Sequence, residues 1–141
     1  MRIYAATATL ACALFLGAGG QAAEAHSPKG KAYHVTVYSS FNTQFDDCFS
    51  FLKDGTLVIS GFGQLLYRFD ELNGQTDAWQ ALSTQGPFGL AFHGSVGGAD
   101  GRTISGNGLN FDGDTFILQG VVDPRCAAER ARGAGGSPYR D

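Results

Sequence analysis

An Asp-Gly pair that leads into a run of Thr and apolar residues occurs three times in this chain of 141 residues, and this phrase restricts the fold most. Glycine accepts a positive φ without steric cost and aspartate tolerates it, so Asp-Gly favours the tight turn of a β-hairpin. The Thr, branched and aromatic residues that follow favour a pleated strand. Each phrase therefore predicts a turn followed directly by a strand. The phrases begin at Asp54, Asp100 and Asp112.

Alternating apolar residues predict further strands before and between these turns. No window shows a convincing amphipathic helix, and the 21 glycines of the chain disfavour long helices. The pattern indicates about eight short strands. They cover residues 33–38, 48–53, 56–62, 64–69, 78–82, 88–93, 102–106 and 115–122.

The short turns between these segments determine how the strands pair. Strands joined by short turns are neighbours in a sheet and run antiparallel. A series of such strands forms a meander, which closes into a barrel or folds into a two-layered sandwich. A closed barrel leaves no exposed strand edge. We therefore predict a small all-β fold, an antiparallel meander in a closed or nearly closed barrel, in preference to a β-sandwich.

The amino terminus has the three-part order of an export signal. Arg2 supplies a positive charge, an uncharged apolar run follows over residues 3–18, and small residues lead to Ala25. The apolar run is shorter than the ~20 residues that a membrane-spanning helix needs. The residue three before Cys12 is Thr9, whereas lipoprotein signals usually have Leu there. We expect residues 1–25 to be cleaved, the protein to be periplasmic or extracellular, and the mature form to lack a transmembrane anchor.

Cleavage would leave two cysteines, Cys48 and Cys126. An even pair in an oxidising compartment favours a disulfide bond. The two residues are far apart and form no Cys-x-x-Cys motif, which disfavours a redox site. We predict a Cys48–Cys126 disulfide in a single β domain over residues 33–126. Residues 26–32 are expected to form a polar lead-in, and residues 127–141, which have no apolar period, a disordered tail.

Several function classes find no support in the sequence. The net charge of −3 offers no basic face for nucleic acid. The nucleophile elbow, the dinucleotide-binding fingerprint and the P-loop are absent. Asp46 and Asp47 are adjacent, so on a strand they point to opposite faces and cannot act as a catalytic pair. An enzyme, namely an envelope-associated hydrolase, is therefore the least favoured class.

Metal-binding residue types are present but lack ligand spacing. Asp112 and Asp114 lie in a glycine- and asparagine-rich turn region without the twelve-residue calcium pattern. His34 and His93 lie in separate predicted strands and form no short ligand motif. We expect neither a metal nor a cofactor.

Aromatic residues at alternating positions give the most specific functional hypothesis. In a small barrel such residues either fill the interior, which is the simpler interpretation, or line a pocket for an apolar ligand. The protein would then be a binding module for a small apolar molecule. The alternative is a protein-interaction or inhibitor domain that acts through glycine-rich loops within residues 94–114. The candidate pocket residues are Phe49, Phe51, Tyr67, Trp79, Phe92 and Phe116.

The layout of a signal peptide, a meander of about eight strands and one bridge to the end of the domain resembles calycin-type barrels, the class of lipocalins and avidins. The Gly-x-Trp signature of lipocalins is absent from the first predicted strand, and the sole tryptophan, Trp79, lies in mid-chain. The resemblance therefore implies a barrel architecture and no functional residues.

Overall fold

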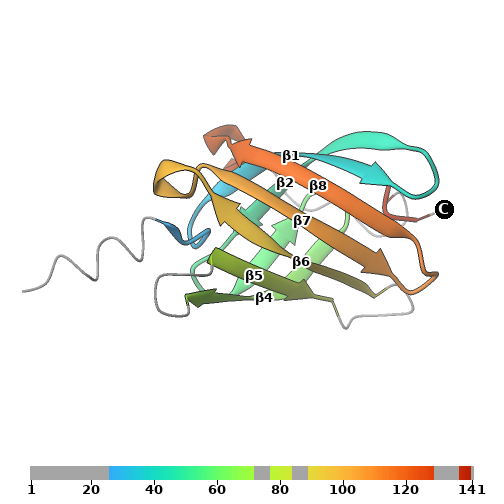
Figure 1. The fold of residues 1–141 in the computed structure, drawn as a ribbon, viewed down its shortest axis with the longest axis horizontal. Coiled ribbons are helices and arrows are strands. Elements are labelled where there is room, and N and C mark those ends of the chain that lie inside the picture. Colours follow the sequence, from blue (N-terminus) through green and yellow to red (C-terminus); the bar gives the residue numbers. More distant parts are fainter. Residues whose placement is uncertain (1–25, 72–76, 84–88, 129–136, 141) are drawn as a thin grey trace, which may run out of the picture.

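A computed structural model describes residues 26–71, 77–83, 89–128 and 137–140, so the predicted signal peptide lies outside the described residues. Eight antiparallel strands pair in chain order and β1 closes the ring by pairing with β8, which confirms the predicted meander barrel (Figure 1). The strands are β1 (Ala32–Ser39), β2 (Gln44–Phe51), β3 (Thr56–Ile59), β4 (Gly63–Glu71), β5 (Asp77–Leu82), β6 (Leu90–Gly97), β7 (Thr103–Asn110) and β8 (Thr115–Val122), with short 3₁₀ helices η1 (Ala99–Gly101) and η2 (Pro124–Ala128).

All three Asp-Gly pairs lie in hairpin turns, as predicted. They join β2 to β3, β6 to β7 and β7 to β8. Gly55, Gly101 and Gly113 have φ values of 91°, 65° and 88°, a region that glycine enters without strain. In the first turn the Asp54 carboxylate also accepts a hydrogen bond from the backbone N–H of Thr56 at 2.9 Å. The sequence phrase therefore directs the chain reversal at these three points.

Three strands extend four residues beyond their predicted bounds. β2 begins at Gln44, β6 runs to Gly97, and β7 runs to Asn110. Glycine has a low β-propensity, so the glycine-rich stretch in residues 94–114 suggested loops. That prediction is wrong for residues 94–97 and 107–110, which form the end of β6 and the second half of β7. Only residues 98–102 and 111–114 connect strands.

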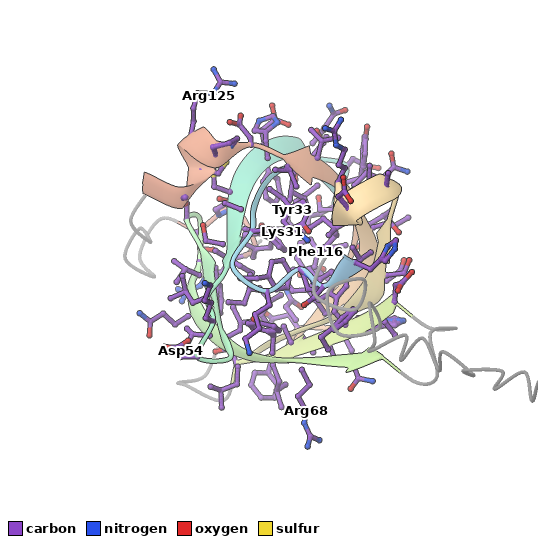
Figure 2. All side chains as sticks on the ribbon, turned by 90° about the vertical axis from the view of Figure 1, so that its left-hand side faces the viewer. Lys31, Tyr33, Asp54, Arg68, Phe116 and Arg125 are labelled. Atoms are coloured by element: carbon purple, nitrogen blue, oxygen red, sulfur yellow. A yellow bond between two sulfur atoms is a disulfide. The ribbon has the colours of Figure 1, made fainter. Side chains whose placement is uncertain are left out.

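Aromatic rings crowd the barrel interior (Figure 2). Tyr33 lies near one end, where its hydroxyl donates a hydrogen bond to the Gly101 carbonyl oxygen at 2.8 Å. The alternation of strand residues places these rings inside and the polar residues outside. The largest fully buried side chains are Trp79, Tyr33, Tyr139, Phe49, Phe51 and Phe116.

Glycines in β6 and β7 make room for this packing. A Cβ on Gly108 would collide with the Phe92 ring, and one on Gly106 would lie 3.2 Å from the Trp79 ring. A Cβ on Gly94 would collide with the Ser105 carbonyl oxygen, because β6 and β7 approach closely there. The glycines thus allow the wall to lie close to bulky interior rings.

Gly94→Ala is expected to lower the free energy of unfolding by about 2 kcal/mol, the usual scale of an overpacking defect. The new methyl group would push against backbone, which cannot move aside without disturbing the β6–β7 pairing. Gly97→Ala is the matched control on the same strand, since its Cβ would meet only the Thr103 hydroxyl, at 2.9 Å, which can rotate. Urea unfolding measures both variants. Equal losses would contradict the proposed backbone collision.

The predicted disulfide is present between Cys48 and Cys126, whose Cα atoms lie 5.2 Å apart. Cys48 is on the outer side of β2, and η2 covers it together with Ala32 in a small buried cluster. The Ser50 hydroxyl donates a hydrogen bond to the Cys126 carbonyl oxygen at 3.3 Å. The bridge therefore fixes the segment after β8 against the outside of the wall.

Residues 26–31 lie against the start of the barrel. The backbone N–H of Gly30 donates to the Phe51 carbonyl oxygen at 2.7 Å, and Ser27 and Pro28 are buried. Burial lowers the pKa of the Lys31 ammonium, which the nearby charge of Asp100 partly offsets. In the portion of the chain that is described, no helix has the length and apolar character needed to cross a membrane.

The structure of the carboxyl-terminal segment differs from the predicted disordered tail. Disorder was expected throughout residues 127–141, but Ala127 and Ala128 belong to η2, and Tyr139 is only 1 % exposed. Its ring belongs to the main aromatic core. The prediction is wrong for residues 127, 128 and 137–140, while residues 129–136 and 141 lie outside the described part of the chain. A single aromatic side chain, without any apolar period around it, is enough to enter the barrel.

Candidate functional site

The six predicted pocket residues all lie in the barrel interior and contact one another. The Phe51 ring centroid is 5.0 Å from that of Tyr67 and 5.3 Å from that of Trp79, both edge-to-face. The Phe92 centroid lies 5.5 Å from that of Phe49 and 6.4 Å from that of Phe116. Such ring pairs stabilise a core beyond their buried area. The sequence therefore identified a real cluster, and its role in holding a ligand stays a prediction.

Tyr139 completes this cluster from outside the strands. Its ring centroid lies 5.0 Å from that of Phe45, 5.4 Å from that of Phe116, 6.0 Å from that of Phe92 and 6.1 Å from that of Phe62. The chain end lies at the end of the barrel where β1 turns into β2 and β7 into β8 (Figure 1). We call this end the tail mouth.

Asp47 receives the Tyr139 hydroxyl inside the barrel. The hydroxyl donates to Asp47 Oδ2 at 2.9 Å, and the backbone N–H of Gly61 donates to both carboxylate oxygens at 2.9 and 3.0 Å. The backbone N–H of Cys48 also donates to Oδ1 at 2.8 Å. Burial, with the charge and the hydrogen bond of Asp47, raises the pKa of the Tyr139 hydroxyl well above its usual value. These donors offset the cost of burying a carboxylate.

Asn110 holds the backbone of the tail at the same mouth. Its side-chain amide donates to the Tyr139 carbonyl oxygen at 3.1 Å and to the Asp114 carboxylate at 2.9 Å. This arrangement is not apparent from the sequence. One signal was available, because the opposite orientations predicted for Asp46 and Asp47 are confirmed and imply an inward carboxylate in need of a donor.

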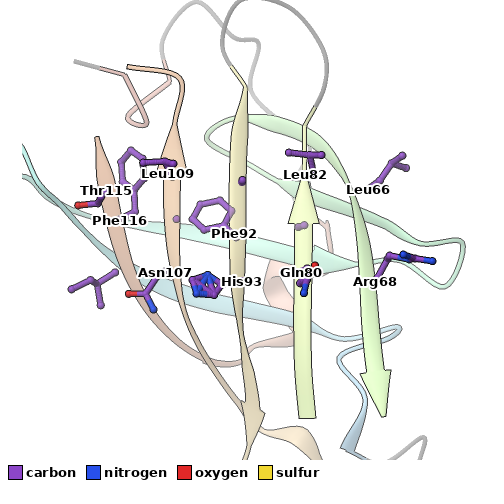
Figure 3. A pocket seen from close by; sticks show the side chains of 14 residues that line it. Leu66, Arg68, Gln80, Leu82, Phe92, His93, Asn107, Leu109, Thr115 and Phe116 are labelled. Carbon is purple, nitrogen blue, oxygen red and sulfur yellow. The ribbon is translucent and has the colours of Figure 1, made fainter. Parts of the chain in front are cut away.

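A second candidate site lies on the outer wall of β4 to β8. The strand register aligns Leu66, Leu82, Ala91 and Leu109 in one row across four strands, which we call the leucine row (Figure 3). The three leucines are 70 %, 53 % and 50 % exposed. Exposed apolar side chains that gather in one place mark interaction sites more often than isolated ones do.

A polar row lies directly beside the leucine row. It consists of Arg68, Gln80, His93 and Asn107, again aligned strand by strand (Figure 3). Together the two rows border a shallow depression of about 950 Å³, the outer groove. No acidic residue belongs to its described lining, and Arg68 forms no ion pair with the described side chains. The outer groove is therefore apolar with a cationic edge.

The residues considered for metal binding do not assemble. Among the described residues, no three His, Cys, Asp or Glu side chains come close enough to hold an ion. His34 Nε2 lies 3.8 Å from the Asp46 carboxylate on the outside of the barrel. His93 belongs to the polar row on another part of the wall, and Asp114 is bonded to Asn110 within its turn.

Comparison with known proteins adds no functional assignment. A scan against protein-family models and searches of curated proteins and of solved structures find no match to this chain.

Proposed function

We propose that this protein is an exported binding module whose outer groove docks an apolar, carboxylate-bearing segment of another exported protein. The leucine row is the observation that carries the proposal. A monomeric barrel gains nothing from three leucines in register on its outer wall, whereas a partner that covers them removes their apolar surface from water. The disulfide is consistent with an oxidising compartment outside the cytoplasm.

Charge favours an acidic partner segment. Arg68 borders the leucine row with an extended side chain that points to solvent, and the described lining of the groove has no carboxylate to compete for it. Arginine binds carboxylates through two parallel hydrogen bonds, which adds orientation to the apolar contact. Gln80 and Asn107 supply neutral donors and acceptors for a partner's backbone. This chemistry deepens the protein-interaction hypothesis and moves it from loops to the strand wall.

Leu66→Ser/Leu109→Ser is expected to weaken partner binding at least tenfold. Each leucine that the partner buries fully contributes about 1.5–3 kcal/mol, which the serine would lose. Arg68→Glu is expected to weaken it as well, through repulsion of the carboxylate. A photo-crosslinking residue at position 107, introduced in the exporting host, identifies the partner by mass spectrometry, and titration with the purified partner gives its affinity.

The matched control is Leu52→Ser/Val121→Ser, which removes two exposed apolar residues away from the outer groove. It should leave partner affinity unchanged. The proposal is overturned if the control weakens binding as much as the groove variants, or if Arg68→Glu has no effect. It is also overturned if sedimentation velocity shows that a second copy of the chain, and no other protein, occupies the groove.

A further inference from the structure

We propose that the tail mouth contains a binding site for a 4-hydroxyphenyl group, and that Tyr139 is the tethered occupant of this site. The walls of the site belong to the barrel itself, whereas the occupant comes from a segment that follows the last strand. The inference rests on the contacts of Tyr139 inside the barrel, although Phe92 and Phe116 also line the outer groove. We call the site the phenol site; its lining residues are Phe45, Asp47, Phe62, Phe92, Asn110 and Phe116.

The rings of the phenol site recognise an aromatic group by its edges and faces. Phe45, Phe62 and Phe92 meet the Tyr139 ring at interplanar angles of 88°, 86° and 82°, and Phe116 at 65°. Edge-to-face contacts on several sides match the quadrupole of a benzene ring and would be lost with an aliphatic occupant. The shape of the site therefore favours one flat aromatic ring.

Asp47 gives the site its selectivity for a hydroxyl. Among the described residues it is the only charged side chain in the buried set, 5 % exposed, and it points inward from β2 into an aromatic interior. A carboxylate in that position is costly unless donors surround it. The backbone supplies two of them, from Cys48 and Gly61, and the occupant's hydroxyl supplies another at 2.9 Å. An occupant without a hydroxyl would remove one of the hydrogen bonds that offset the burial of this carboxylate.

Asn110 binds a carbonyl oxygen on the side of the ring opposite the hydroxyl. Its amide donates to the carbonyl oxygen of the residue that carries the phenol, at 3.1 Å. A ligand with a hydroxyl at one end of the ring and a carbonyl near the other would satisfy both groups. The chemical class is thus a para-substituted phenol, either a small molecule or a tyrosine side chain of a peptide.

The experiment replaces the occupant and supplies the ligand separately. Tyr139→Ala in the otherwise intact chain is expected to bind 4-methylphenol at least tenfold more tightly than the unchanged protein, in which Tyr139 competes. Amide chemical shifts measured by NMR would move at Asp47, Gly61 and Phe116, which border the site. Tyr38→Ala is the matched control, because it removes an aromatic side chain that is 46 % exposed on the outside and opens no interior space.

Ligand chemistry tests the role of Asp47 separately. Toluene has the same ring without the hydroxyl and should bind the Tyr139→Ala variant at least tenfold more weakly than 4-methylphenol. N-acetyl-tyrosinamide adds a carbonyl for Asn110. Tighter binding of this compound than of 4-methylphenol would identify a peptide tyrosine as the source, and weaker binding a small phenol.

The Tyr139→Ala variant gives a clear result even where it does not fold alone. In that case 4-methylphenol should restore the near-ultraviolet circular dichroism of the folded protein, and toluene should restore it less. The proposal is overturned if 4-methylphenol neither binds nor restores folding. It is likewise overturned if toluene acts as well as 4-methylphenol.

Discussion

Replacing both bridge cysteines, Cys48→Ser/Cys126→Ser, is expected to lower the free energy of unfolding by about 4 kcal/mol, because the bridge spans 78 residues of sequence. A cross-link across so long a loop restricts the unfolded chain strongly, since it removes the many conformations in which the two ends are apart. The pairing of β1 with β8 closes the barrel without the bridge. The variant should therefore reach the same fold with a reduced margin of stability.

Urea unfolding with and without a reductant measures this effect. The oxidised protein should lose stability on addition of reductant, and the double variant should not change. Cys48→Ala/Cys126→Ala is the matched control, because it removes the cross-link without placing hydroxyl groups in the buried cluster with Ala32. If either double variant unfolds within about 1 kcal/mol of the oxidised protein, the bridge does not provide the entropic stabilisation argued here.

The strand pattern and the turns made the barrel predictable from the sequence. Asp-Gly pairs specify a backbone conformation locally, so Gly55, Gly101 and Gly113 turn the chain whatever the rest of the fold does. The alternation of strand side chains separates inside from outside in the same local way. The prediction of eight strands in a meander is confirmed. It could be made from the sequence because each turn and each strand pairing depends on residues that are close in sequence.

The glycines of β6 and β7 could not be assigned from local preference. Gly94 and Gly108 lie in strands at positions that require glycine. A larger residue at either position would collide with the neighbouring backbone or with an interior ring. That requirement comes from contacts across the barrel, which a single sequence does not display. Local propensity therefore predicted a loop where tertiary packing selects a strand.

The position of Tyr139 in the barrel core could not be predicted from the sequence for a related reason. It is separated from the last strand by a sequence rich in glycine, alanine and arginine, and nothing near it repeats with a strand or helix period. Its partner Asp47 was recognisable only as an inward-facing acid. The match between one acid on β2 and one tyrosine 92 residues later becomes visible only when the barrel brings them together.

The outer groove could be anticipated in part. Leu65 and Leu66 are adjacent, so one of the two must point outward from a strand, and Leu66 does. The alignment of Leu66 with Leu82 and Leu109 depends on the register between strands, which sequence alternation leaves open. The sequence thus predicts that single leucines are exposed, but it does not predict that they align in one row across the strands.

Three buried tyrosines predict a loss of stability at alkaline pH. Burial raises the pKa of Tyr33 and Tyr67, with Asp54 adding to the effect at Tyr67, and burial and Asp47 raise that of Tyr139. In the unfolded chain these hydroxyls ionise near pH 10, while the folded protein keeps their protons. The folded state then binds more protons than the unfolded state, so stability is fully present below about pH 10 and falls above it. Lys31, whose folded pKa is lowered, acts in the opposite direction.

Between pH 9 and pH 11, Tyr33 and Tyr139 together are expected to reduce the free energy of unfolding by about 3 kcal/mol, since each contributes about 1.4 kcal/mol per pH unit once the unfolded group is ionised. Urea unfolding at half-unit pH steps measures the slope. Tyr139→Phe keeps the ring and removes the ionisable group, so its slope above pH 10 should be shallower by about 1.4 kcal/mol per pH unit. Lys31→Gln removes the opposing group and should make the slope steeper. An unchanged slope in Tyr139→Phe would mean that the hydroxyl ionises equally in both states, which its hydrogen bond to Asp47 and its burial argue against.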